Sequence, residues 1–165
     1  MKRNTNLKLR NSMGWQCASC ARLITRVSDG WVEWLASEDE KGEAIVNGLR
    51  LVHRQSCRYD ARKVFGDWQS VVEGLSLERF TGPDGLVLLL SLLAAGELPI
   101  SEVIELAKRV QIPGYEFARN LVGNRNLPQV LSPSLGYGCY LQSEMAELIT
   151  LVCRGNLESG VGALP

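Results

Sequence analysis

The sequence predicts an α+β protein, in which a small β-hairpin module precedes a mostly α-helical domain of four to five helices. Three observations support this class. The stretch GWVEWL at 30–35 is rich in strand-forming residues. Asn47-Gly48, between two short apolar runs, is typical of a hairpin turn. From about residue 60 the apolar residues recur with a helical period. We expect three segments: 1–65, the β module with a basic N-terminal arm; 66–155, the helical domain; and 156–165, a flexible tail.

The β module is predicted from local patterns. Trp31 to Trp34 alternate in a strand-like manner, and the acidic stretch SEDEKGE at 37–43 is typical of an exposed loop. The stretch 43–53 then supplies a hairpin that turns at Asn47-Gly48. We therefore expect a small antiparallel sheet.

The helices are predicted from apolar stripes and end signals. The best marked covers 81–96, where Thr81 is the expected N-cap, Pro83 lies in the first turn and Gly96 closes the end. Apolar residues surround this helix, so we expect it to be the central core helix. The other predicted helices cover 67–75, 100–111, 114–122 and 141–155.

The bulk composition indicates a globular, cytoplasmic protein. The apolar stretch at 86–95 is about half of what spans a bilayer, and no apolar run follows the basic N-terminus, so we expect no membrane association. In a reducing compartment, cysteines are better explained as thiols or metal ligands than as disulfides. The formal net charge is zero, but basic residues gather in three blocks: 1–28, 48–63 and 106–126. These blocks form a basic face only if they meet in space.

Four side chains have the spacing of a zinc site: Cys17, Cys20, His53 and Cys57. Zinc prefers four tetrahedral ligands drawn from thiolate and imidazole. Two cysteines separated by two residues reach one ion across a tight turn, and His53-x-x-x-Cys57 also fits. The chain has one histidine and five cysteines, so their concentration here is informative. Three thiolates with Zn²⁺ leave about one negative charge, which the nearby arginines are expected to offset: Arg22, Arg50, Arg54 and Arg58.

Two alternatives to a zinc site exist for these residues. In the first, they are three incidental cysteines and a surface histidine. In the second, Cys17 and Cys20 form a thioredoxin-like redox pair, although such a pair requires a βαβ context. If zinc is bound, four protein ligands close its shell, so a structural role is favoured over a catalytic one.

The order of a Cys-x-x-Cys turn, a small β-sheet and a second ligand pair resembles the treble-clef class of zinc finger over residues 15–65. The resemblance implies that a knuckle, a hairpin and the start of a helix share one ion. Two features depart from the commonest pattern: the second pair is His-x-x-x-Cys, and no glycine follows Cys20.

Residues 102–122 resemble a helix-turn-helix, with a tight junction at 112–114. The resemblance implies DNA contacts from the second helix through Tyr115, Arg119 and Asn120, with Arg125 just beyond it. An ordinary helical corner, with Tyr115 in the core, is the open alternative. Arg22, Arg54 and Arg58 of the zinc module are the further candidates for nucleic-acid contact.

The sequence predicts no enzyme, because it lacks the common nucleotide-binding and hydrolase motifs and its single histidine is assigned to zinc. Two functions remain. One is a nucleic-acid-associated regulator of a bacterial or phage type, whose partner is DNA. The other is an adaptor that binds a protein partner, in which zinc only stabilises the fold.

Overall fold

The computed structural model describes residues 14–60, 63, 71–124, 143–147 and 150. The chain forms two compact units that divide after Gln111. The described part of the first unit holds five strands and the helices α2 and α3, and that of the second holds α4 and the helical residues 143–147. The described elements are mixed α and β, as the sequence predicts. The segment boundary at residue 65 stays a prediction.

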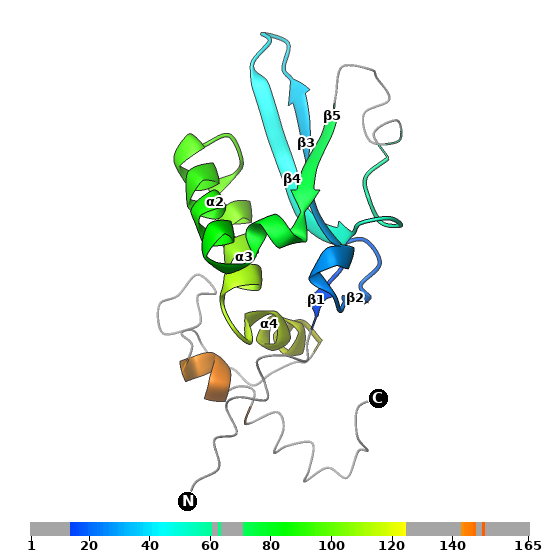
Figure 1. The fold of residues 1–165 in the computed structure, drawn as a ribbon. Helices are drawn as coiled ribbons and strands as arrows, with labels where there is room; N and C mark the ends of the chain where they lie inside the picture. The colour runs from blue at the N-terminus through cyan, green and yellow to red at the C-terminus, as the bar shows by residue number, and fades with distance from the viewer. Residues whose placement is uncertain (1–13, 61–62, 64–70, 125–142, 148–149, 151–165) are drawn as a thin grey trace, which may run out of the picture. The chain divides into compact units, whose positions relative to one another are not determined.

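A three-stranded antiparallel sheet forms one side of the first unit (Figure 1). Its strand order is β4-β3-β5, with β3 at Gly30–Glu38, β4 at Ala44–His53 and β5 at Val71–Ser76. The central strand contains the GWVEWL stretch, so the strand predicted there is confirmed. Val32 is buried, and its partners in the two ladders are Leu51 and Leu75.

The hairpin turn predicted at Asn47-Gly48 is wrong. The chain reverses between β3 and β4 in the acidic loop, where Asp39 Oδ1 accepts hydrogen bonds of 2.8 Å from the backbone N–H groups of Lys41 and Glu43. Asn47-Gly48 lies inside β4, at a register shift opposite Trp34. Gly48 has a φ of 68° there, so the left-handed residue serves a bulge instead of a turn.

The helix predicted at 67–75 is wrong for its described part, because residues 71–76 form β5. This strand pairs antiparallel with β3 from Trp31↔Ser76 to Ala36↔Val71. A short apolar run is compatible with a helix or a strand, and here pairing with the edge of β3 favours the strand. Residues 64–70 lie outside the described part.

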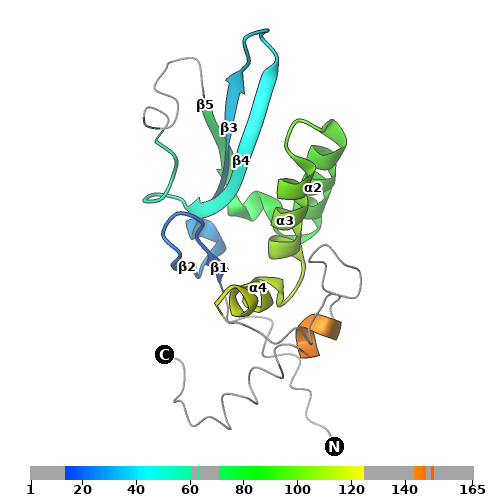
Figure 2. The ribbon, with the colours of Figure 1, turned by 180° about the vertical axis from the view of Figure 1, so that it is seen from behind.

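A second, two-stranded sheet forms a small knuckle near the end of β4 (Figure 2). It pairs β1, Trp15–Gln16, with β2, Leu23–Ile24, and a short 3-10 helix follows at Val27–Asp29. The backbone N–H of Ala18 donates a 2.9 Å hydrogen bond to the carbonyl of Leu51, which ties the knuckle to β4.

Helices α2, Gly82–Ala95, and α3, Ile100–Gln111, follow a 3-10 turn at Leu77–Phe80. Both helices were predicted with nearly these bounds. Thr81 does not cap α2 with its side chain, because its hydroxyl donates to the Glu78 carbonyl at 3.1 Å. Gly96 closes α2 as predicted, with a φ of 70°.

The prediction that α2 is a central core helix is wrong. Leu89 is fully buried, but the helix also carries three exposed apolar residues, Leu86, Val87 and Leu90. A largely apolar helix therefore covers one side of the core, which it forms with a set of buried residues: Val32, Leu51, Leu77, Phe80, Val103 and Leu106.

Helix α3 connects the two sheets of the first unit. Glu102 accepts a 2.7 Å hydrogen bond from the backbone N–H of Leu49 in β4. Near the other end of α3, Arg109 donates to the Gln16 carbonyl at 2.7 Å, and its own carbonyl accepts from the Trp15 indole at 3.2 Å. The helix thus contacts β4 and the knuckle strand β1.

In the second unit, α4 spans Tyr115–Asn124, which confirms a helix where 114–122 was predicted. Tyr115 and Ala118 are buried and pack with Met145. The predicted flexible tail, the basic N-terminal arm and most of 148–155 lie outside the described residues. Among the helices of the described part, none is long and apolar enough to cross a membrane.

Candidate metal centre

Three short segments bring four ligand side chains together. Cys17 and Cys20 lie in the turn between β1 and β2, which closes through Cys17 N–H donating to the Arg22 carbonyl at 2.9 Å and Ala21 N–H donating to the Cys17 carbonyl at 3.0 Å. His53 is the last residue of β4. Cys57 follows after a turn at 54–56.

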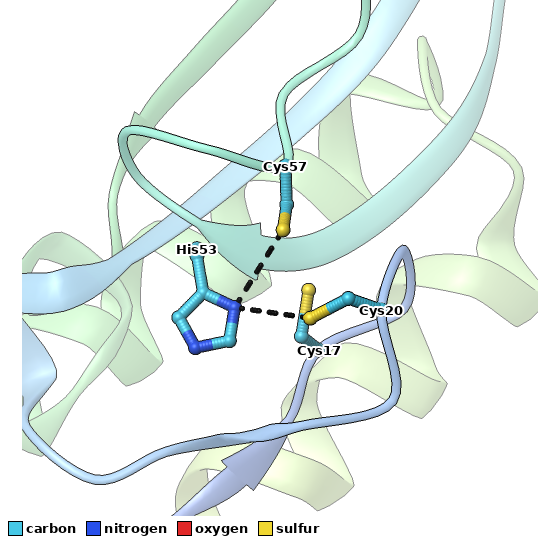
Figure 3. Close-up of side chains that lie close together, drawn as sticks. All are labelled: Cys17, Cys20, His53 and Cys57. Carbon is cyan, nitrogen blue, oxygen red and sulfur yellow. Dashed lines mark hydrogen bonds between the residues drawn. The ribbon is translucent and has the colours of Figure 1, made fainter.

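The distances fit one tetrahedral ion. With Zn–S near 2.3 Å and Zn–N near 2.0 Å, a sulfur and an imidazole nitrogen lie about 3.5 Å apart, and two sulfurs about 3.8 Å apart. The Nδ1 atom of His53 lies 3.5 Å from Cys20 Sγ and 3.8 Å from Cys57 Sγ (Figure 3). All four ligand atoms, including Cys17 Sγ, lie within 4.8 Å of one another. This Cys3His cluster can hold a metal ion.

The backbone selects the ring nitrogen of His53 that faces the sulfurs. Nε2 lies 3.3 Å from the carbonyl of Leu23, which only accepts hydrogen bonds. Nε2 therefore carries a proton, which leaves Nδ1 as the lone-pair donor in the neutral ring. A ligating histidine fixed in this way is the usual arrangement of metal sites.

The surroundings favour the thiolate form of two cysteines. The side chain and backbone of Arg22 donate to Cys20 and lower its pKa to about 6. Burial raises the pKa of Cys17, but backbone hydrogen bonds from Cys20 and His53 outweigh it, so the net shift is downward. Since a metal ligand must be a thiolate, both shifts favour binding at neutral pH.

The other two groups shift in the opposite direction. For Cys57, the Ser56 hydroxyl lowers the pKa, but burial and the neighbouring thiols outweigh it and raise it. For His53, burial lowers the pKa, but hydrogen bonds with Cys17 and Cys20 and the negative charge of Cys17 outweigh this effect, so the net shift is upward. The concentrated negative charge therefore favours a cation at the centre, either a proton on His53 or a metal ion.

Arg22 interacts directly with the side chain of a candidate ligand. The Arg22 side chain hydrogen-bonds Cys20, and the pKa of Arg22 is raised by that contact. The guanidinium of Arg50 instead pairs with Glu33 at 2.8 Å. Compensation of the thiolate charge, expected from four arginines, is thus carried most directly by Arg22.

The treble-clef resemblance implies that the second ligand pair leads into a helix. In the structure, no helix directly follows this pair. Residues 54–60 form turns and irregular backbone. Instead, β4 delivers His53, and the following turn delivers Cys57. The first pair lies in a knuckle, as the resemblance implies. A hairpin lies between the two pairs, but it joins β3 to β4 through the acidic loop and does not turn at Asn47-Gly48.

Two of the arginines proposed for nucleic-acid contact meet at one ring. The guanidinium carbons of Arg54 and Arg58 lie 5.6 and 4.6 Å from the centre of the Trp31 ring. Both arginines are exposed, as is Arg22. We call Trp31, Arg54 and Arg58 the arginine–tryptophan cluster.

The remaining candidates belong to the second unit. Arg119 is exposed and Asn120 is half-buried. Tyr115 is 7% exposed and packs with Ala118 and Met145 in the core of the second unit, which removes its side chain from the candidate surface. Arg125 lies outside the described residues.

Sequence reasoning missed the role of Glu33 and Arg50. Glu33 is fully buried, and Arg50, directly opposite it on β4, donates a hydrogen bond to the Cys57 carbonyl. The only local signal for a buried Glu33 is its place between Trp31 and Trp34 in a predicted strand. A glutamate in such a strand is more simply interpreted as exposed to solvent.

Comparison of the chain with models of protein families, with curated proteins and with solved structures gave no match.

Proposed function

We propose that the Cys3His cluster is a structural zinc site. The donor set of three thiolates and one imidazole is the kind that zinc prefers, and the distances from His53 Nδ1 agree with tetrahedral geometry. Four protein ligands complete the coordination shell, which leaves no position for a substrate. The ion would join the β1–β2 turn to the end of β4, so its role is to hold these segments together. We propose no enzymatic activity for this centre.

We further propose that the metal-bound unit acts as a nucleic-acid-associated regulator. The observation that carries this proposal is the arginine–tryptophan cluster beside the centre. Arginine recognises phosphate through a planar fork of donors, and a ring under the guanidinium limits its freedom while leaving its edge available. Arg54 and Arg58 therefore offer two phosphate contacts close together, as expected for a surface that follows a nucleic-acid backbone.

Salt titration of binding to random duplex DNA tests this function. The wild-type protein is expected to bind, with log K falling linearly against log salt, because bound phosphates release counterions. Arg54→Ala and Arg58→Ala should each weaken binding and reduce the slope by about 1. Arg26→Ala is the matched control, since Arg26 is exposed and pairs with Asp29 at 2.9 Å. Binding that is absent, or equally weakened by all three substitutions, would refute the proposal.

The exposed face of α2 favours a second candidate, a protein-interaction adaptor. Leu86, Val87 and Leu90 are 44%, 63% and 56% exposed and share one side of the helix. Contiguous exposed apolar residues are typical of protein contacts. A photo-crosslinking residue at Val87 should then give a specific adduct that Leu90→Lys abolishes. An adduct unaffected by Leu90→Lys would exclude this face.

A further inference from the structure

Glu33 is a buried carboxylate in the centre of the sheet. Its exposed fraction is 0%, and it lies on β3 opposite Arg50 of β4. A buried carboxylate is costly unless it is paired and hydrogen-bonded, so a position of this kind requires a physical explanation.

Three donors converge on one oxygen of this carboxylate. Glu33 Oε1 accepts from Arg50 Nε at 2.9 Å, from Arg50 Nη2 at 2.8 Å and from the backbone N–H of Tyr59 at 2.9 Å. The second oxygen, Oε2, has no hydrogen-bond partner among the described residues, and Arg58 Nε lies 3.8 Å from it. The strong contacts therefore connect β3 to β4 and to the segment that follows Cys57.

The same contacts extend to the ligand segment itself. Arg50 Nη2 also donates to the Cys57 carbonyl at 3.3 Å. The Arg50 guanidinium lies over the Tyr59 ring, 3.2 Å from its centre, and the Tyr59 hydroxyl donates to the Gly48 carbonyl at 3.3 Å. Polar contacts with Glu33 and Arg50, and the hydrogen bond to the Gly48 carbonyl, thus hold residues 57–59 against the sheet.

Cys57 differs from the other three ligands in how its backbone is held. Cys17 and Cys20 belong to a closed turn between paired strands, and His53 is paired with Gly30 in the sheet. Cys57 lies outside regular secondary structure. The contacts of Glu33 and Arg50 supply the constraint that strand pairing supplies elsewhere.

We propose that Glu33, acting through Arg50 and Tyr59, is a positioning residue that holds Cys57 in place for metal binding. The proposal rests on the metal site of the proposed function. Outer contacts of this kind orient the ligands of metal centres, and their loss typically weakens metal binding about 10- to 100-fold. The sheet and the metal centre are then energetically coupled through one buried carboxylate.

The test uses the full-length, zinc-loaded protein and its Glu33→Gln variant, which preserves shape and removes charge. Chelator competition should show zinc affinity reduced about tenfold or more. Under limiting iodoacetamide, mass spectrometry should find Cys57 alkylated before Cys17 and Cys20. Glu102→Gln is the matched control, because Glu102 also accepts a backbone hydrogen bond from β4 but lies on α3. It should leave affinity and alkylation order unchanged.

Arg50→Lys keeps the proposal testable if Glu33→Gln does not fold. Lysine retains the charge beside Glu33 but loses the second donor that reaches the Cys57 carbonyl, so the same preferential alkylation of Cys57 is expected. Unchanged zinc affinity, or three cysteines alkylated at equal rates in the folded variants, would overturn the positioning role. A wild-type protein that binds no zinc would instead overturn the metal site, and this inference with it.

Discussion

Ala21 follows the second cysteine ligand with a φ of 59°, and it is the non-glycine residue with positive φ in the described part of the chain. The left-handed region costs an L-residue about 1–2 kcal/mol, and glycine avoids this cost. Because alanine and not glycine follows Cys20, the backbone of the knuckle is strained at Ala21.

Ala21→Gly should stabilise the metal-loaded protein. Glycine relieves the strained φ but adds freedom to the unfolded chain, so the net gain is expected to be about 0.5–1 kcal/mol. Chemical denaturation measures it. Ala18→Gly, at an exposed position of the same turn, is the control and should give no gain. Equal effects of the two substitutions would contradict the proposed strain.

The pH at which the centre releases its metal should depend on Arg22. Its contact lowers the pKa of Cys20 to about 6, so the thiolate persists to lower pH than an ordinary cysteine. Removing the contact raises this pKa, and protons then compete with the metal at higher pH.

In Arg22→Ala, zinc release during acidification should therefore begin at a higher pH than in the wild type. A zinc-sensitive dye monitors release. Arg26→Ala serves as the control, because Arg26 pairs with Asp29. The mechanism fails if both variants release zinc at the wild-type pH.

Among the secondary-structure elements, β5 depends on a close approach to β3 at Gly74. A Cβ atom there would lie 2.5 Å from both the Trp31 indole nitrogen and the Val32 carbonyl oxygen. The backbone atom cannot move aside without separating the strands, so glycine is required at this position.

Gly74→Ala should destabilise the protein by about 1–3 kcal/mol, as expected for overpacking against backbone. Val71→Ala, at an exposed position of the same strand, should change stability by less than about 0.5 kcal/mol. Thermal or chemical unfolding compares the two. A tolerated alanine at position 74 would show that β5 is not packed against β3 as described.

The secondary-structure elements also show which parts of the fold sequence patterns can predict. Helix α2 was predictable because Pro83 and Gly96 mark its ends chemically. The Cys3His cluster was predictable because metal chemistry restricts both residue type and spacing. The strand at 71–76 was not, since its conformation depends on pairing with β3 more than thirty positions earlier in the chain. Gly48 was misassigned because a left-handed glycine serves turns and bulges equally well.

The contacts around Glu33 could not be predicted from local sequence patterns. The pairing of Glu33 with Arg50 requires the register of β3 against β4, and the contact with Tyr59 requires the path of the chain after Cys57. Neither is encoded locally. The role of Glu33 near the metal centre therefore emerges only from the folded chain.

At the scale of the whole molecule, the ion is expected to connect segments that regular structure joins weakly. The knuckle contains two strands of two residues each, which are too short to be stable alone. Metal binding supplies of order 10 kcal/mol in zinc-finger peptides. Chelation should therefore lower the melting temperature and release hydrogen-exchange protection first at 15–24 and 53–57. Added zinc should restore both, and unchanged protection after chelation would contradict this coupling.

Elemental analysis of the purified full-length protein is the decisive measurement for the metal centre. We predict about one zinc per chain, with Cys17→Ser and His53→Ala each losing most of the bound metal. Wild-type protein without stoichiometric metal, or variants that retain it fully, would contradict the assignment of Cys17, Cys20, His53 and Cys57 as the ligands of one ion.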